Sequence, residues 1–261
     1  KQIEELKKLY GFDKPAHVRY VEMLVNFARF DLGKSFMQNK DVWTLIKEKL
    51  PVSISLGLWS FLLAYLVSVP LGIKAAVNKG KGVDQFIRII SLVGLSFPNF
   101  WLAIMLVLLL SITFPLLPPS GWDGAISLVL PALTMAIILS ATNVRLVRTA
   151  MLETLSAQYI MVARSKGLKE RVVLYKHALR NCAIPLITYI GLQFGNLIGG
   201  LVVVEKVFNW PGLGTLAFDA IANRDYPVLQ GTVTVLAVII VAVNLLVDIA
   251  YGLVDPRIRN K

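Results

Sequence analysis

Residues 159–185 read YIMVARSKGLKERVVLYKHALRNCAIP and form the centre of a polar segment, 145–181, in a chain that is otherwise mostly apolar. The segment carries eight Lys and Arg residues against two acidic residues. Gly167 divides it into two halves, each with a helical pattern. We expect a turn at Gly167, because glycine makes sharp turns without strain. A basic, folded segment of this size predicts a surface on which another molecule docks.

The rest of the sequence predicts a membrane protein. Hydrophobic residues make up 56% of the 261 residues and charged residues 16%, whereas soluble domains average about 25% charged residues. Five stretches are nearly free of charge, and each has about the 20 residues that cross a bilayer as a helix. They are residues 51–73, 89–112, 126–144, 182–204 and 228–247. We therefore expect an all-α membrane fold with five visible transmembrane helices.

The basic residues set the expected orientation in the membrane. The segments 74–88, 145–181 and 252–261 are rich in Lys and Arg, whereas 113–125 and 205–227 are nearly neutral. Loops rich in Lys and Arg stay on the cytoplasmic side. This rule places the basic segments and the C-terminus in the cytoplasm.

The same topology places the N-terminal segment, residues 1–49, outside the cytoplasm. Its short stretches of helical periodicity predict an external amphipathic segment that precedes a transmembrane domain, 50–261. A strongly charged segment does not cross a membrane unaided, and the chain shows no signal peptide. We therefore expect a sixth transmembrane helix before Lys1.

No motif predicts catalysis or a bound cofactor in this chain. Residues 28–35, ARFDLGKS, fit a relaxed phosphate-loop pattern, but Ala28 replaces the first glycine and a helical pattern precedes it instead of a strand. His17 and His177 lie on opposite sides of the membrane in the expected topology, so no metal site is expected. The net charge of +11 is concentrated at helix ends, which favours membrane lipid and argues against a nucleic-acid partner.

A few polar residues within the apolar stretches are candidates for lining a transport pathway. Pro98 interrupts the second stretch, where Ser96 or Asn99 can bond the carbonyl that proline frees. Gln193 and Asn196 occur in the fourth stretch. For all of these residues, packing or hydrogen bonding between helices remains an open alternative.

The external segment 205–227 predicts a turn followed by a short amphipathic helix. The turn is Trp210-Pro211-Gly212, and Arg224-Asp225-Tyr226-Pro227 ends the helix. The segment either closes the outer mouth of a pore, receives a partner, or anchors at the membrane interface. Candidate gate or partner-contact residues are Trp210, Pro211, Gly212, Gly214, Asp225 and Tyr226.

The segment 159–185 resembles the cytoplasmic loop of ABC importer permeases, and within them the B-type permease subunits of peptide and nickel importers. The loop of that branch typically reads Y-x-x-x-A-R-x-K-G-L…H-A-L-R-N-A-x-x-P. The residues that match are Tyr159, Ala163, Arg164, Lys166, Gly167, Leu168, His177, Ala178, Leu179, Arg180, Asn181 and Pro185. The general signature of ABC importer permeases is matched only at Ala163, Gly167 and Leu179.

Distant stretches agree with the same branch, so the resemblance covers nearly the whole chain. They are 10–15 with 31–35, 211–214 with 224–227, and 245–259, which ends in Asp-Pro-Arg-Ile-Arg. The resemblance implies the transmembrane domain of a type I ABC importer, with a first helix before Lys1.

For function, the resemblance implies half of the translocation pathway for peptides, in a bacterial or archaeal cytoplasmic membrane. It implies a heterodimer with a homologous C-type permease, two ATPase subunits (or one fused pair) that bind ATP and Mg, and an extracytoplasmic substrate-binding protein. The alternative class is an autonomous channel or secondary transporter, and the alternative cargo is nickel or another small solute.

The loop itself has a physical interpretation as a coupling element. We expect a helix over 156–166 that presents Ala163, small enough for close approach, and a second helix over 169–180 that returns the chain to the membrane. The residues expected to couple to the ATPase are Ala163, Arg164, Lys166, Gly167, Leu168 and His177.

Overall fold

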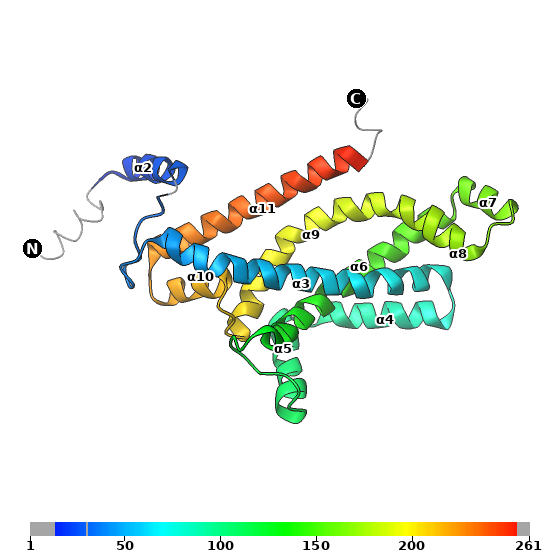
Figure 1. Ribbon diagram of the computed structural model, residues 1–261, viewed down its shortest axis with the longest axis horizontal. Coiled ribbons are helices and arrows are strands. Elements are labelled where there is room, and N and C mark those ends of the chain that lie inside the picture. Colours follow the sequence, from blue (N-terminus) through cyan, green and yellow to red (C-terminus); the bar gives the residue numbers. More distant parts are fainter. Residues whose placement is uncertain (1–13, 30, 255–261) are drawn as a thin grey trace, which may run out of the picture.

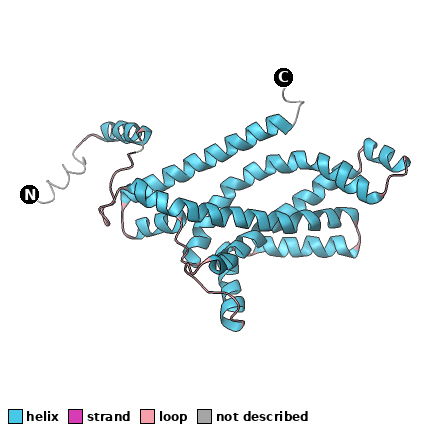
Figure 2. Ribbon diagram, in the orientation of Figure 1, coloured by secondary structure: helices cyan, strands magenta, loops and turns pink. Residues whose placement is uncertain are grey.

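The protein is almost entirely helical in a computed structural model that describes residues 14–29 and 31–254 (Figures 1 and 2). Within these ranges no β-strand occurs, and one isolated backbone bridge joins Lys34 to Asp41. The helices are α2 (Ala16–Ala28), α3 (Val42–Val77), α4 (Gly82–Ser96), α5 (Asn99–Val107), α6 (Val129–Leu155), α7 (Gln158–Ser165), α8 (Glu170–Val172), α9 (Leu179–Val207), α10 (Leu213–Ala222) and α11 (Tyr226–Val254). Two π-helical segments, η1 (Leu108–Thr113) and η3 (Val173–Ala178), continue α5 and α8, and a 3-10 turn, η2 (Ala125–Leu128), precedes α6. The predicted all-α fold is confirmed.

Three helices of the described chain are long and apolar enough to cross a membrane: α3, α6 together with η2, and α11. The bent pair formed by α4 and α5 with η1 makes a fourth span if it is counted as one. These helices contain four of the five predicted stretches. The remaining stretch, 182–204, lies within α9, whose side chains are described only in part.

The longest helix, α3, begins earlier than the apolar pattern indicates. Asp41 is its N-cap and its first residue is Val42, so the end of the expected external segment 1–49 forms the first turns of α3. The segment 145–181 likewise begins inside α6, which continues to Leu155. In both cases the helix extends past the apolar stretch into turns that carry charged residues. The length of the apolar stretch therefore does not indicate where the helix begins or ends.

The centre of the bundle is the contact between α3 and α6, which lie side by side (Figure 1). The hydroxyl of Ser140 on α6 donates to the carbonyl of Ala64 on α3 at 3.1 Å. Farther along both helices, a Cβ atom built on Gly72 would lie 2.6 Å from Cβ of Val147. From the first contact to the second, the residue number increases in both helices, so α3 and α6 run parallel. Small residues on α3 permit this close approach.

The predicted bend at Pro98 is a complete break. The axes of α4 and α5 differ by 101°, because Pro98 provides no N–H to continue the helix and Phe97 adopts an extended conformation. The hydroxyl of Ser96 donates to the carbonyl of Leu92 at 3.0 Å, within its own helix. Beyond the break, α5 packs against α6 and α9, and η1 extends away from the bundle (Figure 1).

A buried ion pair fixes α4 to α6 near the end expected to face the cytoplasm. Both carboxylate oxygens of Asp84, which is 1% exposed, accept hydrogen bonds from Arg148 at 2.6 and 2.7 Å. The N–H of Gly80 donates to the same carboxylate at 2.9 Å. Such bidentate pairs fix geometry as well as charge. From the sequence, the surrounding segment, 74–88, is recognised only as rich in Lys and Arg, and Asp84 is not singled out.

Replacing Gly72 by Ala is expected to destabilise the protein by about 1–3 kcal/mol, the usual cost of overpacking a core. The added methyl group would overlap Val147. Gly199 on α9 is the matched control, because a Cβ atom there meets nothing within 4 Å. The melting temperatures of both variants in detergent are the measurement. An unchanged melting temperature for Gly72→Ala would show that α3 and α6 are not in close contact.

Candidate functional site

Two exposed regions lie at opposite ends of the bundle, one around α7 and α8 and the other around α10 (Figure 1). The first, which we call the docking surface, combines exposed apolar side chains with basic ones. Its apolar residues are Tyr159, Met161, Val162, Leu168, Val172 and Tyr175, and its basic residues are Lys166, Lys169, Arg171, Lys176 and Arg180. An exposed apolar patch with a polar rim is typical of a protein-protein contact.

Helix α7 is anchored to the bundle through its buried face. Ile160 is fully buried and Ala163 is 7% exposed, and both belong to an apolar cluster that includes Ile73, Val147 and Met151. Sequence reasoning expected Ala163 to face a partner, but the structure turns it inward. Helix α7 packs on η3, and the buried cluster links both to α3 and α6, so a displacement of α7 acts on these helices through the cluster.

The predicted turn at Gly167 is present. Gly167 has φ +73°, a conformation that other residues adopt only with strain. A Cβ atom there would meet nothing within 4 Å, so the requirement for glycine is conformational. After the turn, one α-helical turn leads into η3 and then into α9 without a break. His177 is half-buried on η3, and its carbonyl accepts a hydrogen bond from Asn181 at 2.8 Å.

Arg164 and Glu170 form an ion pair across this turn. The guanidinium donates to both carboxylate oxygens, at 2.6 and 3.2 Å. The guanidinium of Arg164 holds the pKa of the Glu170 carboxyl below its ordinary value, and Glu170 raises the pKa of Arg164. Because both side chains are about half exposed, the pair contributes at most about 1 kcal/mol. It restrains the turn, while Lys166 and Leu168 remain exposed.

The candidate pathway residue Gln193 points into the bundle. Its side-chain N–H donates to the carbonyl oxygen of Asn143 on α6 at 2.8 Å, and both residues are buried. This geometry favours the alternative of hydrogen bonding between helices. The side chain of Asn196 lies outside the described residues. Sequence reasoning missed Asn143. The available signal was that Asn143 is itself a polar residue within an apolar stretch.

The other candidate pathway residues lie at the break between α4 and α5. Pro98 is the N-cap of α5, and Asn99 is its half-buried first residue. The amide nitrogen of Asn99 would lie 3.3 Å from a Cβ atom built on Gly200, so it faces α9. Ser96 is exposed. Their role in a pathway stays a prediction.

At the opposite end, the predicted turn and helix are confirmed as residues 210–212 and α10. Trp210 is fully buried and packs against Trp122, with ring centroids 4.6 Å apart. Pro211 is half-buried and Gly212 is the N-cap of α10. Trp210 thus belongs to the core of this end and is not exposed to a partner.

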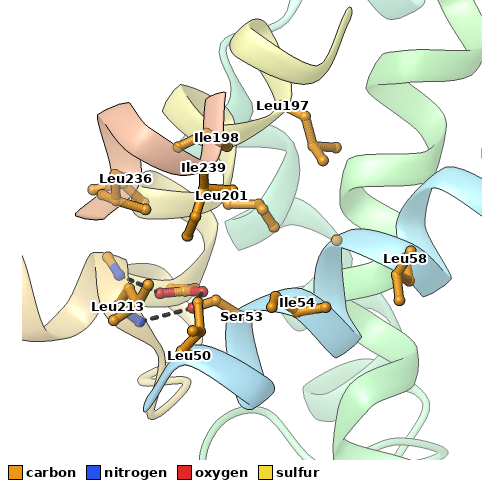
Figure 3. A pocket seen from close by; sticks show the side chains of 14 residues that line it. Leu50, Ser53, Ile54, Leu58, Leu197, Ile198, Leu201, Leu213, Leu236 and Ile239 are labelled. Carbon is orange, nitrogen blue, oxygen red and sulfur yellow. Dashed lines mark hydrogen bonds between the residues drawn. The ribbon is translucent and has the colours of Figure 1, made fainter. Parts of the chain in front are cut away.

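The first N–H groups of α10 are bonded by side chains from two other helices. Leu213 donates to the hydroxyl of Ser53 on α3 at 2.7 Å. Gly214 and Thr215 donate to one carboxylate oxygen of Glu205 on α9, at 2.6 and 3.3 Å. The Ser53 hydroxyl donates to the other carboxylate oxygen at 2.5 Å. Figure 3 shows Ser53 and Leu213 facing each other within this network.

Glu205 explains both glycines of the turn. A Cβ atom on Gly212 or Gly214 would lie within 2.8 Å of the Glu205 carboxylate, and one on Gly214 would lie 2.5 Å from Cα of Val202. Sequence reasoning identified the glycines but missed Glu205 and Ser53. An acidic residue directly after an apolar stretch and shortly before Gly-x-Gly was the available signal.

Asp225 is also committed to an internal contact. It is 4% exposed, and its carboxylate accepts hydrogen bonds from the Ser35 hydroxyl and from the N–H of Phe36. The serine of the phosphate-loop-like sequence therefore binds a carboxylate of its own chain. Tyr226, in contrast, is 57% exposed and accessible to a partner.

Comparison with known proteins yields one matching family and several relatives that align with nearly the whole of this chain. The family described as binding-protein-dependent transport system inner membrane component matches residues 68–260. The chain is 39% identical to the oligopeptide transport system permease protein AppB of Bacillus subtilis (strain 168), over 98% of this chain and 84% of that protein. It is 37% identical to the dipeptide transport system permease protein DppB of Escherichia coli (strain K12), over 96% of this chain and 83% of that protein.

A solved structure with a similar fold is that of the MetNI methionine ABC transporter in inward-facing conformations. The TM-score is 0.71 at 15% sequence identity, covering 81% of this chain and 96% of the matched chain. Together with the family match, this similarity confirms the predicted fold of a type I ABC importer transmembrane domain.

Replacing Ser53 by Ala is expected to destabilise the protein by about 1–3 kcal/mol, because it leaves the N–H of Leu213 and a carboxylate oxygen of Glu205 without their partner. Ser55→Ala is the matched control on the same helix, since the Ser55 hydroxyl bonds only the carbonyl of Val52 in its own turn. Melting temperatures measured in detergent distinguish the two. Equal decreases in melting temperature for Ser53→Ala and Ser55→Ala would contradict the hydrogen-bond network around Glu205.

Proposed function

The chain belongs to the family of inner membrane components of binding-protein-dependent transport systems, and we propose that it is the membrane-spanning permease subunit of an ABC importer for peptides. The observation that carries this proposal is the similarity to the oligopeptide and dipeptide permeases over nearly the whole chain. The names of these relatives support a peptide cargo. In this arrangement the chain forms half of the translocation pathway and a homologous C-type permease forms the other half.

The docking surface is the proposed contact with an ATPase subunit, which binds ATP and Mg. Its exposed apolar side chains, Met161 and Tyr175 among them, would fill an apolar groove. Its basic residues would meet an acidic rim, since complementary charges fix the register of an interface. Because Ile160 and Ala163 belong to the same buried cluster as residues of α3 and α6, movement of the ATPase would be transmitted to the transmembrane bundle.

The end around α10 is the proposed contact with an extracytoplasmic substrate-binding protein. Phe218, Ile221 and Tyr226 are 48–60% exposed there, and the distribution of basic residues supports placing this end outside and the C-terminus in the cytoplasm. ATP binding would bring the ATPase subunits together, displace α7, and open the bundle outward to receive the peptide. Release of the ATPase pair would return it inward.

Replacing Met161 or Tyr175 by Glu is expected to reduce co-purification of the ATPase subunits at least about tenfold, which corresponds to about 1.4 kcal/mol of lost binding. A buried carboxylate without a partner would face the groove. Ile221→Glu, at the opposite end of the bundle, is the matched control and should retain the ATPase.

The same preparations test transport directly. In proteoliposomes, the complex with the C-type permease, ATPase subunits and binding protein should accumulate a labelled peptide only when ATP is supplied. Met161→Glu should abolish this uptake. Uptake by the chain alone, without ATPase subunits, would contradict the proposed function and indicate an autonomous channel or secondary transporter.

A further inference from the structure

The start of α10 depends on other helices for its hydrogen bonds. The first N–H groups of any α-helix have no partner within the helix, and a side chain at the N-cap usually supplies one. Here the N-cap is Gly212, which has no side chain. Ser53 and Glu205 supply the acceptors instead, for the N–H groups of Leu213, Gly214 and Thr215. The position of α10 is therefore set by α3 and α9.

The surroundings of Glu205 make these bonds costly to break. Glu205 is 1% exposed and Ser53 8% exposed. Beside them lies a small apolar slot between α3, α9, α10 and α11, shown in Figure 3. Ser53 and Glu205 are the only polar side chains among the described residues that line it. If α10 moved away, three N–H groups and a carboxylate would face this apolar slot without replacement partners.

Sterics and two further contacts also hold α10. The backbone of its first turn lies so close to α9 that a Cβ atom on Gly214 would be 2.5 Å from Cα of Val202. Lys206 of α9 forms an ion pair with Asp219 of α10 at 2.7 Å. Just after α10, Asp225 binds the hydroxyl of Ser35. The helix is thus held at its start, on its side and after its end.

We propose that Glu205 is a positioning residue that keeps α10 attached to α3 and α9 throughout the transport cycle. On this inference, which rests on the proposed function, the outer end of the pathway opens between this subunit and its partner subunit. Movement of α10 relative to α3 and α9 within the subunit does not contribute to this opening. A carboxylate suits this role because its charge also complements the positive end of the α10 helix dipole.

The test measures a distance within the subunit in the complete transporter. Spin labels are placed at Ile221 on α10 and Trp59 on α3, both at least 50% exposed, in a background in which the buried Cys182 is replaced by Ala. Pulsed electron paramagnetic resonance records the distance without nucleotide and with ATP trapped. The expected shift is below about 2 Å, the size above which a segment counts as rearranged. A larger shift in wild-type complex would overturn the inference.

Variants of Glu205 test whether the distance between the two spin labels depends on the hydrogen bonds from α10 to Glu205. Glu205→Ala should broaden the distance distribution and reduce ATP-driven peptide uptake at least about tenfold, which corresponds to about 1.4 kcal/mol. Glu205→Gln, whose amide oxygen can still accept from Gly214 and Thr215, should keep a narrow distribution. If Glu205→Ala does not assemble into the transporter, the distance is measured in Ser53→Ala, which removes only the acceptor of the Leu213 N–H. A narrow distribution in the variant that assembles, Glu205→Ala or Ser53→Ala, would also overturn the inference.

The two proposals fail in distinguishable ways. Uptake is measured separately with the unlabelled wild-type complex, because the label at Ile221 lies at the proposed contact with the binding protein. Absence of uptake would count against the proposed function, whereas a moving α10 in a complex that does take up peptide would count against the role of Glu205 alone.

Discussion

The close contact of α3 with α6 is the constraint on which the other features of this subunit depend. Gly72 allows the two helices to approach until Val147 would touch any added side chain, and Ser140 bonds the α3 backbone across the same interface. The docking surface is attached at one end of this pair through Ile160 and Ala163. At the other end, α10 is attached to α3 through Ser53. One rigid pair thus connects both exposed regions.

On the proposed function, this arrangement gives a physical route between ATP hydrolysis in a partner subunit and transport. A packed helix pair transmits displacement because protein interiors are close-packed and compress little. Force applied to α7 therefore reaches α6 and α3, and α10 follows because its N-terminal hydrogen bonds end on α3 and α9. On the proposed function, the subunit behaves as one body that tilts against its partner. The buried pair of Asp84 with Arg148 extends this body to α4.

The sequence was sufficient where local patterns decide the structure, and insufficient where distant residues meet. Charge-free stretches predicted the helices, Gly167 its turn, and the periodicity after Gly212 the helix α10. The inward direction of Ala163 depends on a cluster assembled from five helical segments, α3, α6, α7, η3 and α9. The bond between Ser53 and Glu205 joins residues 152 positions apart, and no local pattern indicates that these two side chains meet.

The central claim is that the α7 end of this chain contacts an ATPase in the cytoplasm. A photocrosslinking amino acid at Met161, which is 57% exposed, tests it in the assembled transporter, with Ile221 at the α10 end as the comparison site. We predict an adduct with the ATPase subunit from position 161 and none from position 221. An ATPase adduct from position 221, or none from position 161, would contradict both the docking surface and the orientation.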